Sequence, residues 1–159
     1  MAAGEGRIVA TLPRAATTIA YSPDGARLVI GDGTGEMLVV DAESGGVVMR
    51  PDPVAGETEI EYSPDGRYFA GAGPGPYAHL WDANSGRLVR RLRGAIGPPQ
   101  GLAFIEGGNA IRVAGSAGFD RGYVLEPDRL AELARAATTR QLSDEECERY
   151  LGSSCDDRP

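Results

Sequence analysis

The pentapeptide YSPDG occurs twice in this chain of 159 residues, at 21–25 and again at 62–66. The match extends well beyond the pentapeptide, because TTIAYSPDGARLVIGDGTGEMLVVDAESGGVVMR from Thr17 aligns with TEIEYSPDGRYFAGAGPGPYAHLWDANSGRLVRR from Thr58. Internal repeats with a period of about 20 to 50 residues are typical of proteins built from stacked, similar units. The repeat therefore predicts a chain that folds as a short series of such units.

A third and weaker copy follows the first two. The stretch QGLAFIEGGNAIRVAGSAGFDRGYVLEPDRL places Phe104 where the first two copies have Tyr21 and Tyr62. Its turn, FIEGG at 104–108, keeps the glycines but has lost the Ser, Pro and Asp. We place the three units at about 15–56, 57–97 and 98–126.

Each unit contains short apolar runs that are rich in β-branched and aromatic residues and are separated by Gly, Pro, Asp and Ser. This pattern predicts four strands per unit in an all-β fold. In the first unit we expect a strand ending at Tyr21 and strands near 26–31, 36–41 and 46–50. In the second we expect strands near 58–62, 67–72, 77–82 and 87–92. The third unit lacks an outer fourth strand.

The repeated turns have a structural chemistry of their own. Pro fixes the second position of a turn, Asp accepts hydrogen bonds from nearby backbone N–H groups, and Gly adopts the positive φ that closes a hairpin. DAESG and DANSG repeat this logic between the third and fourth strands. We therefore assign structural, turn-forming roles to Asp24, Gly25, Asp41, Gly45, Asp65, Gly66, Asp82 and Gly86, and group Trp81 with them.

A four-stranded unit of about forty residues whose third strand ends in LWD resembles the WD40-repeat β-propeller family. The closest stretch is AHLWDANSGRLVRRL at 78–92, and the resemblance covers residues 7–126. It implies a partial propeller of about three four-stranded blades. Because propellers typically have about 4 to 8 blades, blades are missing, and RIVATLPR at 7–14 would be an extra strand belonging to a preceding blade.

The sequence pattern of residues 127–159 predicts a helical tail. Leu130, Leu133 and Ala137 recur at helical spacing, and Ser143 with Glu146 forms a capping box for a second short helix. The tail resembles the segment that follows the last blade in bacterial multidomain WD40 proteins, which implies the C-terminal part of a signalling protein. Two states of Cys147 and Cys155 stay open: two reduced thiols, or a disulfide between them.

Charge and hydropathy exclude several classes of function. The net charge is −7, with sixteen basic residues, all Arg, against twenty-three acidic ones, so we expect no general nucleic-acid binding. The chain has no apolar run of about 18 residues that would span a membrane. We therefore expect a cytoplasmic protein that does not bind membranes.

The sequence offers no constellation of catalytic or metal-binding residues. His79 is the only histidine, and GDGTGE at 31–36 lacks the Lys of a phosphate-binding loop. No carboxylate spacing matches a calcium loop. We predict no catalytic, metal or cofactor site.

Strand order in such a unit separates two sets of connections. The repeated turns lie on one rim, which we call the hairpin rim, and the unrepeated loops at 50–59, 73–78, 93–101 and 116–122 lie on the other, the loop rim. Variable loops on a rigid scaffold commonly carry recognition. The residues that we predict to contact a partner are Glu57, Tyr77, Gln100, Phe119 and Arg121.

The sequence thus favours a non-catalytic protein–protein interaction scaffold or sensory propeller module. Its expected partners are proteins, among them a second copy of the chain or the missing N-terminal blades, because a terminal blade leaves an apolar flank exposed. The alternative is a propeller enzyme of the lactonase or hydrolase type. That alternative requires carboxylates or histidines converging on a channel, and a metal.

Overall fold

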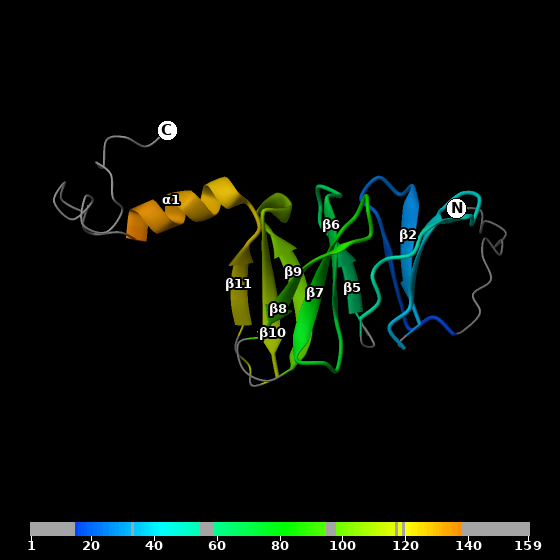
Figure 1. The fold of residues 1–159 in the computed structure, drawn as a ribbon, viewed down its shortest axis with the longest axis horizontal. Helices are drawn as coiled ribbons and strands as arrows, with labels where there is room; N and C mark the ends of the chain where they lie inside the picture. The colour runs from blue at the N-terminus through cyan, green and yellow to red at the C-terminus, as the bar shows by residue number, and fades with distance from the viewer. Residues whose placement is uncertain are drawn as a thin grey trace, which may run out of the picture. The chain divides into compact units, whose positions relative to one another are not determined.

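The computed structural model of the chain describes residues 15–32, 34–54, 59–94, 98–116, 118 and 120–137. The chain divides into two compact parts, Met1–Leu125 and Glu126–Pro159. The N-terminal part consists of antiparallel β-sheets, and the C-terminal part contains the helix α1, Pro127–Ala137 (Figure 1). The expectation of a β-protein followed by a C-terminal helix is confirmed.

Three sheets follow one another along the N-terminal part, one for each sequence repeat, and we call them sheets A, B and C. Sheet A comprises β1 (Thr18–Tyr21), β2 (Arg27–Gly31), β3 (Met37–Asp41) and β4 (Val47–Met49). Sheet B comprises β5 (Glu59–Tyr62), β6 (Tyr68–Ala72), β7 (Tyr77–Asp82) and β8 (Leu88–Arg93). Sheet C comprises β9 (Pro99–Ile105), β10 (Ala110–Gly115) and β11 (Asp120–Val124), with a 3-10 turn at Glu106–Gly108 between β9 and β10.

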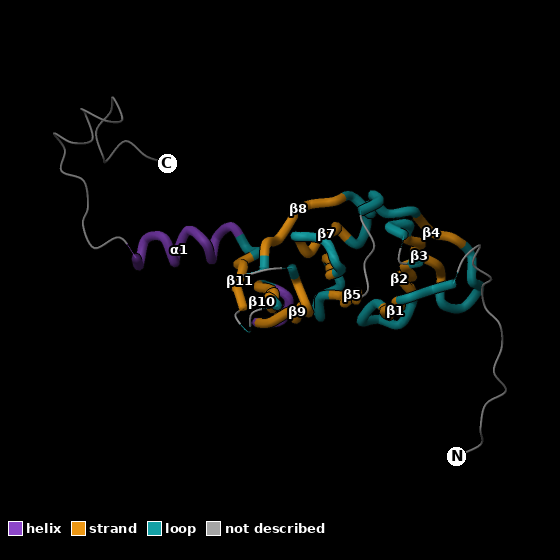
Figure 2. Tube along the Cα trace, turned by 90° about the horizontal axis from the view of Figure 1, so that it is seen from below, coloured by secondary structure: helices purple, strands orange, loops and turns teal. Residues whose placement is uncertain are grey.

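Within each sheet the strands pair with their sequence neighbours, so each unit is an antiparallel meander. The strands of sheets A and B lie within one residue of the bounds expected from the sequence. Sheet C has three strands and no outer fourth strand among its described residues. Figure 2 shows the first strands, β1, β5 and β9, along one side of the sheets, and β4 and β8 along the other.

The core between sheets A and B is built from alternating positions of each strand. Val29 and Val39 of sheet A pair across β2 and β3 and pack with Phe69 and Trp81 of sheet B. The rings of Phe69 and Trp81 stack with centroids 5.3 Å apart. The Trp81 indole N–H donates to the Asp52 carbonyl at 3.0 Å, which fixes the connection between the two sheets.

A second core joins sheets B and C. It contains Leu80 and Leu92 of sheet B and Phe104, Ile111 and Val113 of sheet C, with smaller alanine side chains between them. At its margin the Tyr123 hydroxyl donates to the Arg93 carbonyl at 2.7 Å and accepts from the Arg93 N–H at 2.9 Å. Each interface between adjacent sheets therefore combines apolar packing with a hydrogen bond from the polar group of an aromatic side chain to a backbone carbonyl.

Trp81 lies inside β7, the strand expected at 77–82, and its side chain is fully buried, so its structural role is in the core and not in the turns with which it was grouped. A large apolar ring gains more by filling the space between two sheets than by bordering a turn. The expected strand at 7–14, the second tail helix, Cys147 and Cys155 lie outside the described residues.

In the part of the chain that the structure describes, no helix combines the length and the hydropathy needed to cross a membrane.

Candidate functional site

The hairpin rim of sheets A and B carries two copies of one hydrogen-bond network. In the first, the Ser22 hydroxyl donates to Asp24 Oδ1 at 2.6 Å, and Asp24 Oδ1 also accepts the Ala26 N–H at 3.0 Å. The Arg27 N–H donates to Ser22 Oγ at 2.9 Å. Gly25 closes the turn with a φ of 71°, a conformation that favours glycine.

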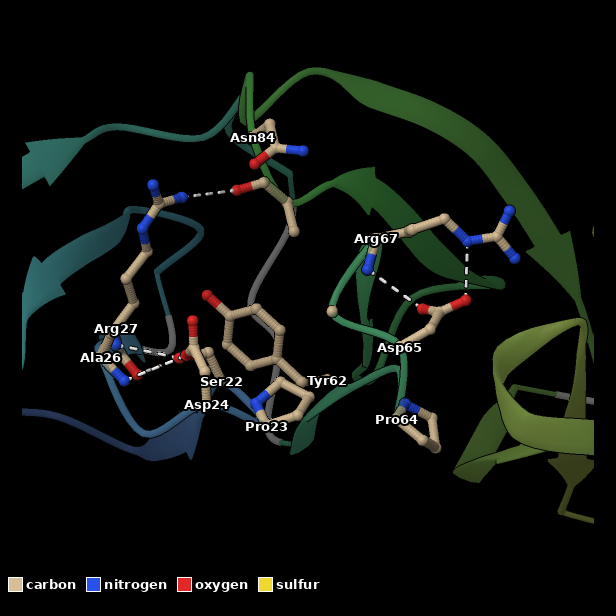
Figure 3. Close-up of a pocket in the computed structure, with 12 residues that line it drawn as sticks. Ser22, Pro23, Asp24, Ala26, Arg27, Tyr62, Pro64, Asp65, Arg67 and Asn84 are labelled. Atoms are coloured by element: carbon tan, nitrogen blue, oxygen red, sulfur yellow. Dashed lines mark hydrogen bonds and ion pairs between the residues drawn. The ribbon is translucent and has the colours of Figure 1, made fainter.

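The second copy repeats these contacts almost unchanged. The Ser63 hydroxyl donates to Asp65 Oδ1 at 2.7 Å, the Arg67 N–H donates to the same oxygen at 3.0 Å, and the Tyr68 N–H donates to Ser63 Oγ at 2.9 Å. Arg67 Nε adds an ion pair to Asp65 Oδ2 at 2.6 Å (Figure 3). These turns are built from local contacts, and the same sequence gives the same turn.

The turns between the third and fourth strands use a similar device. Asp41 Oδ1 accepts from the N–H and hydroxyl of Ser44, each at 2.7 Å, and Asp82 Oδ1 accepts from the corresponding groups of Ser85 at 2.8 and 2.7 Å. Gly86 has a second constraint, because an added Cβ would lie 3.1 Å from the Pro51 Cα. Carboxylate and glycine together fix each of these turns.

These hydrogen bonds hold the four turn carboxylates ionised. The Ser22 hydroxyl, followed by the Ala26 N–H, lowers the pKa of Asp24 below its ordinary value. Ser44 lowers the pKa of Asp41 and Ser85 that of Asp82 in the same way. Burial raises the pKa of Asp65, but hydrogen bonds from Ser63 and Arg67 outweigh it and the net shift is downward. Such carboxylates are poor proton donors near neutral pH.

In the third unit, a contact with the neighbouring turn accounts for the glycine at position 108. A Cβ on Gly108 would lie 2.8 Å from the Asp65 carboxyl carbon, so the neighbouring turn occupies the space that a side chain would need. Arg67 Nη2 also donates to Asn109 Oδ1 at 3.0 Å. The turn of sheet C is therefore shaped by its contact with the turn of sheet B.

A groove of about 460 Å³ opens on the hairpin rim between sheets A and B. Its sides are the two SPDG turns, and its end is formed by the turn that follows β7. Arg27 reaches across and donates from Nη1 to the Ala83 carbonyl at 3.3 Å. The lining residues that carry the argument below are Asp24, Arg27, Tyr62, Asp65, Arg67 and Asn84.

Tyr62 is the unusual residue of this groove. Its side chain is buried, with 7% of the residue exposed, and its hydroxyl has no hydrogen-bond partner among the described residues. Figure 3 shows the hydroxyl directed between the hairpins, toward the side where Arg27 lies. Burial raises the pKa of Tyr62, so the hydroxyl is protonated and can donate. A buried polar group without a partner costs about 1 to 3 kcal/mol.

The loop rim carries a smaller groove of about 260 Å³ between sheets B and C. Glu59, Pro74, Pro99 and Gln100 contribute to its lining. Beside it, burial raises the pKa of Glu61, and repulsion from Glu59 adds to the shift.

The structure describes three of the five predicted contact residues, and only one of the three lines this groove. Gln100 lines the groove, whereas Tyr77 begins β7 and is half-buried, and Arg121 is exposed in β11. Glu57 and Phe119 lie outside the described residues. Their role in partner binding stays a prediction.

The histidine and the candidate metal ligands of the described residues lie apart from the two grooves or form no cluster. His79 is buried in β7, with its ring centroid 5.8 Å from that of Trp81. No group of three or more His, Cys, Asp or Glu in the described ranges could hold a metal ion.

No family model matches the chain, and no curated protein matches it in sequence. Among solved structures, it is similar to hydrazine synthase from Kuenenia stuttgartiensis, with a TM-score of 0.60 and 19% sequence identity over 78% of this chain. The match covers 37% of that chain, so the present chain spans well under half of its length. In all, 921 solved chains match the fold. Similarity at this level of identity shows the fold, and a widely shared fold does not define a function.

Sequence reasoning missed the groove residues Arg27, Tyr62 and Asn84. Tyr62 differs from its repeat counterpart Tyr21 only in its surroundings, whereas Arg27 and Asn84 stand where the other copy has Tyr68 and Glu43. The repeat itself was the signal that could have predicted this groove. Adjacent units place their hairpins side by side, so residues that flank SPDG meet at the interface between neighbouring sheets.

Proposed function

We propose that this chain is a non-catalytic protein-interaction module, in which the three sheets are blades of a partial WD40-type propeller. The groove between the hairpins of sheets A and B would bind an extended segment of a partner protein. The observation that supports this proposal most directly is the buried hydroxyl of Tyr62, which lines the groove and has no hydrogen-bond partner among the described residues. A ligand that bonds this hydroxyl removes the cost of leaving it unsatisfied.

The balance of groups in the groove favours a peptide over a small ion. Two carboxylates, Asp24 and Asp65, stand against two guanidinium groups, Arg27 and Arg67, so the formal charges of these side chains cancel. Backbone amides offer both donors and acceptors. A guanidinium carries five donors, so Arg27 can bond a peptide carbonyl as well as Ala83.

The chemistry of the same residues supports binding over catalysis. The hydroxyls of Ser22 and Ser63 are buried and donate to carboxylates that the turns hold ionised. A serine nucleophile needs a neighbouring base that removes its proton, and these aspartates have pKa values shifted away from that role. Nothing in the described residues favours the lactonase or hydrolase alternative.

One further element, a role in a bacterial signalling protein, rests on the family resemblance. A cytoplasmic location, and recognition of protein partners in preference to nucleic acid or membranes, rest on the charge and hydropathy of the sequence. The loop rim is the competing place for the same function.

Selection of a displayed random-peptide library on the immobilised chain tests the proposal. Peptides enriched on the wild type should bind Tyr62→Phe about fivefold more weakly, because one hydrogen bond of about 1 kcal/mol is lost. Tyr77→Phe is the matched control on the loop rim and should bind as the wild type does.

Two outcomes would contradict the proposal: recovery of no enriched peptide, or equal binding by the wild type and Tyr62→Phe. A loss confined to Tyr77→Phe would move the binding site to the loop rim. Folding is not expected to confound the comparison, since Tyr62→Phe removes an unpaired hydroxyl and should leave the free chain equally or more stable.

A further inference from the structure

The two SPDG turns differ in one respect that affects the groove between sheets A and B. In the second turn, Arg67 Nε pairs with Asp65 Oδ2, so both carboxylate oxygens of Asp65 are engaged. The first turn has Ala26 at the position of Arg67. The described hydrogen bonds to the Asp24 side chain all end on Oδ1. Asp24 therefore keeps Oδ2 as an open acceptor at the groove.

The arginines at the two interfaces differ in a related way. Between sheets B and C, Arg67 Nη2 donates to the carboxamide oxygen of Asn109 at 3.0 Å. Between sheets A and B, the guanidinium of Arg27 makes one described hydrogen bond, a long one of 3.3 Å to the Ala83 carbonyl. A guanidinium carries five N–H donors, so Arg27 has donors left for a ligand. The contact of Arg67 shows a carboxamide oxygen as the acceptor in the equivalent position.

The Tyr62 hydroxyl lies between these two open groups. Figure 3 shows it between the side chains of Asp24 and Arg27. Burial is the main cause of the raised pKa of Tyr62, while the charge of Arg27 lowers this pKa and the charge of Asp24 raises it. A cation and an anion therefore act on the hydroxyl together, and a charged ligand group placed there would be attracted by one and repelled by the other.

We propose that the groove selects a segment with a side-chain carboxamide, Gln or Asn, and holds this group at the Tyr62 hydroxyl. The carboxamide oxygen accepts from Tyr62 and from the Arg27 guanidinium, and its NH₂ group donates to Asp24 Oδ2. The neutral carboxamide is the side-chain group that combines an acceptor with N–H donors. The inference rests on the proposed function, because it names the side chain that the bound segment places in the groove.

Other side chains match the same three groups less well. A carboxylate has no donor for Asp24 and would lie beside a second negative charge, while an ammonium group has no acceptor for the Tyr62 hydroxyl. An apolar side chain would leave this hydroxyl buried and unsatisfied. The groove should therefore rank carboxamides above acidic, basic and apolar side chains.

Sets of short, capped peptides test this ranking on the whole chain. Each set has one fixed central residue, Gln, Asn, Glu, Lys or Leu, between randomised flanks, and fluorescence anisotropy measures its binding. The Gln and Asn sets should bind at least about tenfold more tightly than the Glu set, because Glu loses one hydrogen bond and adds repulsion. The Lys and Leu sets should also bind more weakly than the Gln set.

A substitution in the first turn tests the contact itself. Asp24→Asn keeps an oxygen for the N–H donor of its turn but removes the charge that disfavours Glu, so the preference for Gln over Glu should disappear. The matched control is Asp41→Asn, the same change in a turn of sheet A outside the groove, and it should keep the preference. The preference compares two peptide sets on one variant, so a partial loss of stability does not alter it.

Each contrary result has a distinct meaning. Equal binding of all sets that is still weakened by Tyr62→Phe would overturn the selection of a carboxamide and retain the proposed function, with the peptide backbone as the bound group. Tighter binding of the Glu set would show that the charge of Arg27 dominates and would also overturn it. A preference for Gln that survives Asp24→Asn would place the carboxamide elsewhere. Absence of binding by every set would overturn both proposals.

Discussion

Sheets A and B are two versions of one repeat that differ mainly in their neighbours. Their turns share the same hydrogen bonds, and their strands share the same register. Yet Ile60 and Tyr62 are buried, whereas Ile19 and Tyr21 are mostly exposed. The comparison teaches that local sequence determines the turns and the apolar face of each sheet, while the adjacent sheet determines whether the isoleucine and tyrosine at the margin of that face are buried.

The largest difference is expected at the position of Trp81. Trp81→Ala removes a fully buried ring that stacks on Phe69 and donates to Asp52, and it should lower the free energy of unfolding by about 3 to 5 kcal/mol. Val40→Ala, the same position in sheet A, removes a smaller side chain that is also buried, and should cost about 1.5 kcal/mol. Denaturant unfolding measures both, and equal losses would contradict the larger contribution of the ring that packs between the two sheets.

A charge at the paired isoleucines sharpens the comparison further. Ile60→Lys places an ammonium between two sheets and should cost about 3 kcal/mol. Ile19→Lys, at a position that is 58% exposed, should change the free energy of unfolding by no more than about 0.5 kcal/mol. Thermal unfolding at low concentration measures the two effects, and a large loss in Ile19→Lys would show that its face is covered within the chain.

The stability that each SPDG turn contributes should be the same in sheets A and B. Ser22→Ala and Ser63→Ala each remove a hydroxyl that donates to an aspartate and accepts a backbone N–H, so each should cost about 1 kcal/mol. Denaturant unfolding of both variants checks this. A difference much larger than about 1 kcal/mol between them would mean that these turns depend on tertiary contacts.

The smallest expected effects appear as pH dependence. The folded pKa values of Asp24 and Asp65 lie below the ordinary value of 3.8, so their contribution to stability is fully present above that value and is lost as the pH falls through the folded pKa. Asp24→Asn and Asp65→Asn should each reduce this acid sensitivity, because each removes a carboxylate whose pKa is lowered in the folded chain. Unfolding midpoints measured from pH 6 to about pH 2 test this, and an unchanged acid sensitivity in both variants would contradict it.

Much of the fold was predictable because the repeat aligns residues with known local preferences. Val29 and Val39 alternate with polar or outward neighbours, and SPDG encodes its own turn through Ser, Asp and Gly. Sheet C was predicted less fully: Gly108 follows from its contact with Asp65, which lies in a different unit and leaves no local signal.

The candidate site was less predictable than the fold. Tyr21 and Tyr62 occupy identical pentapeptides, so no local pattern distinguishes the exposed ring from the buried one with an unpaired hydroxyl. Likewise, the hydrogen bond from the Arg27 guanidinium to the Ala83 carbonyl joins residues of two different repeats. Such contacts arise only when the sheets are placed side by side.

Hydroxyl-radical footprinting of Tyr21 and Tyr62 in dilute protein, read by mass spectrometry, tests the central claim most directly. Tyr62 should be protected and Tyr21 modified, although the two lie in the same pentapeptide. Equal modification of the two rings in dilute protein would contradict the claim that the neighbouring sheet determines burial.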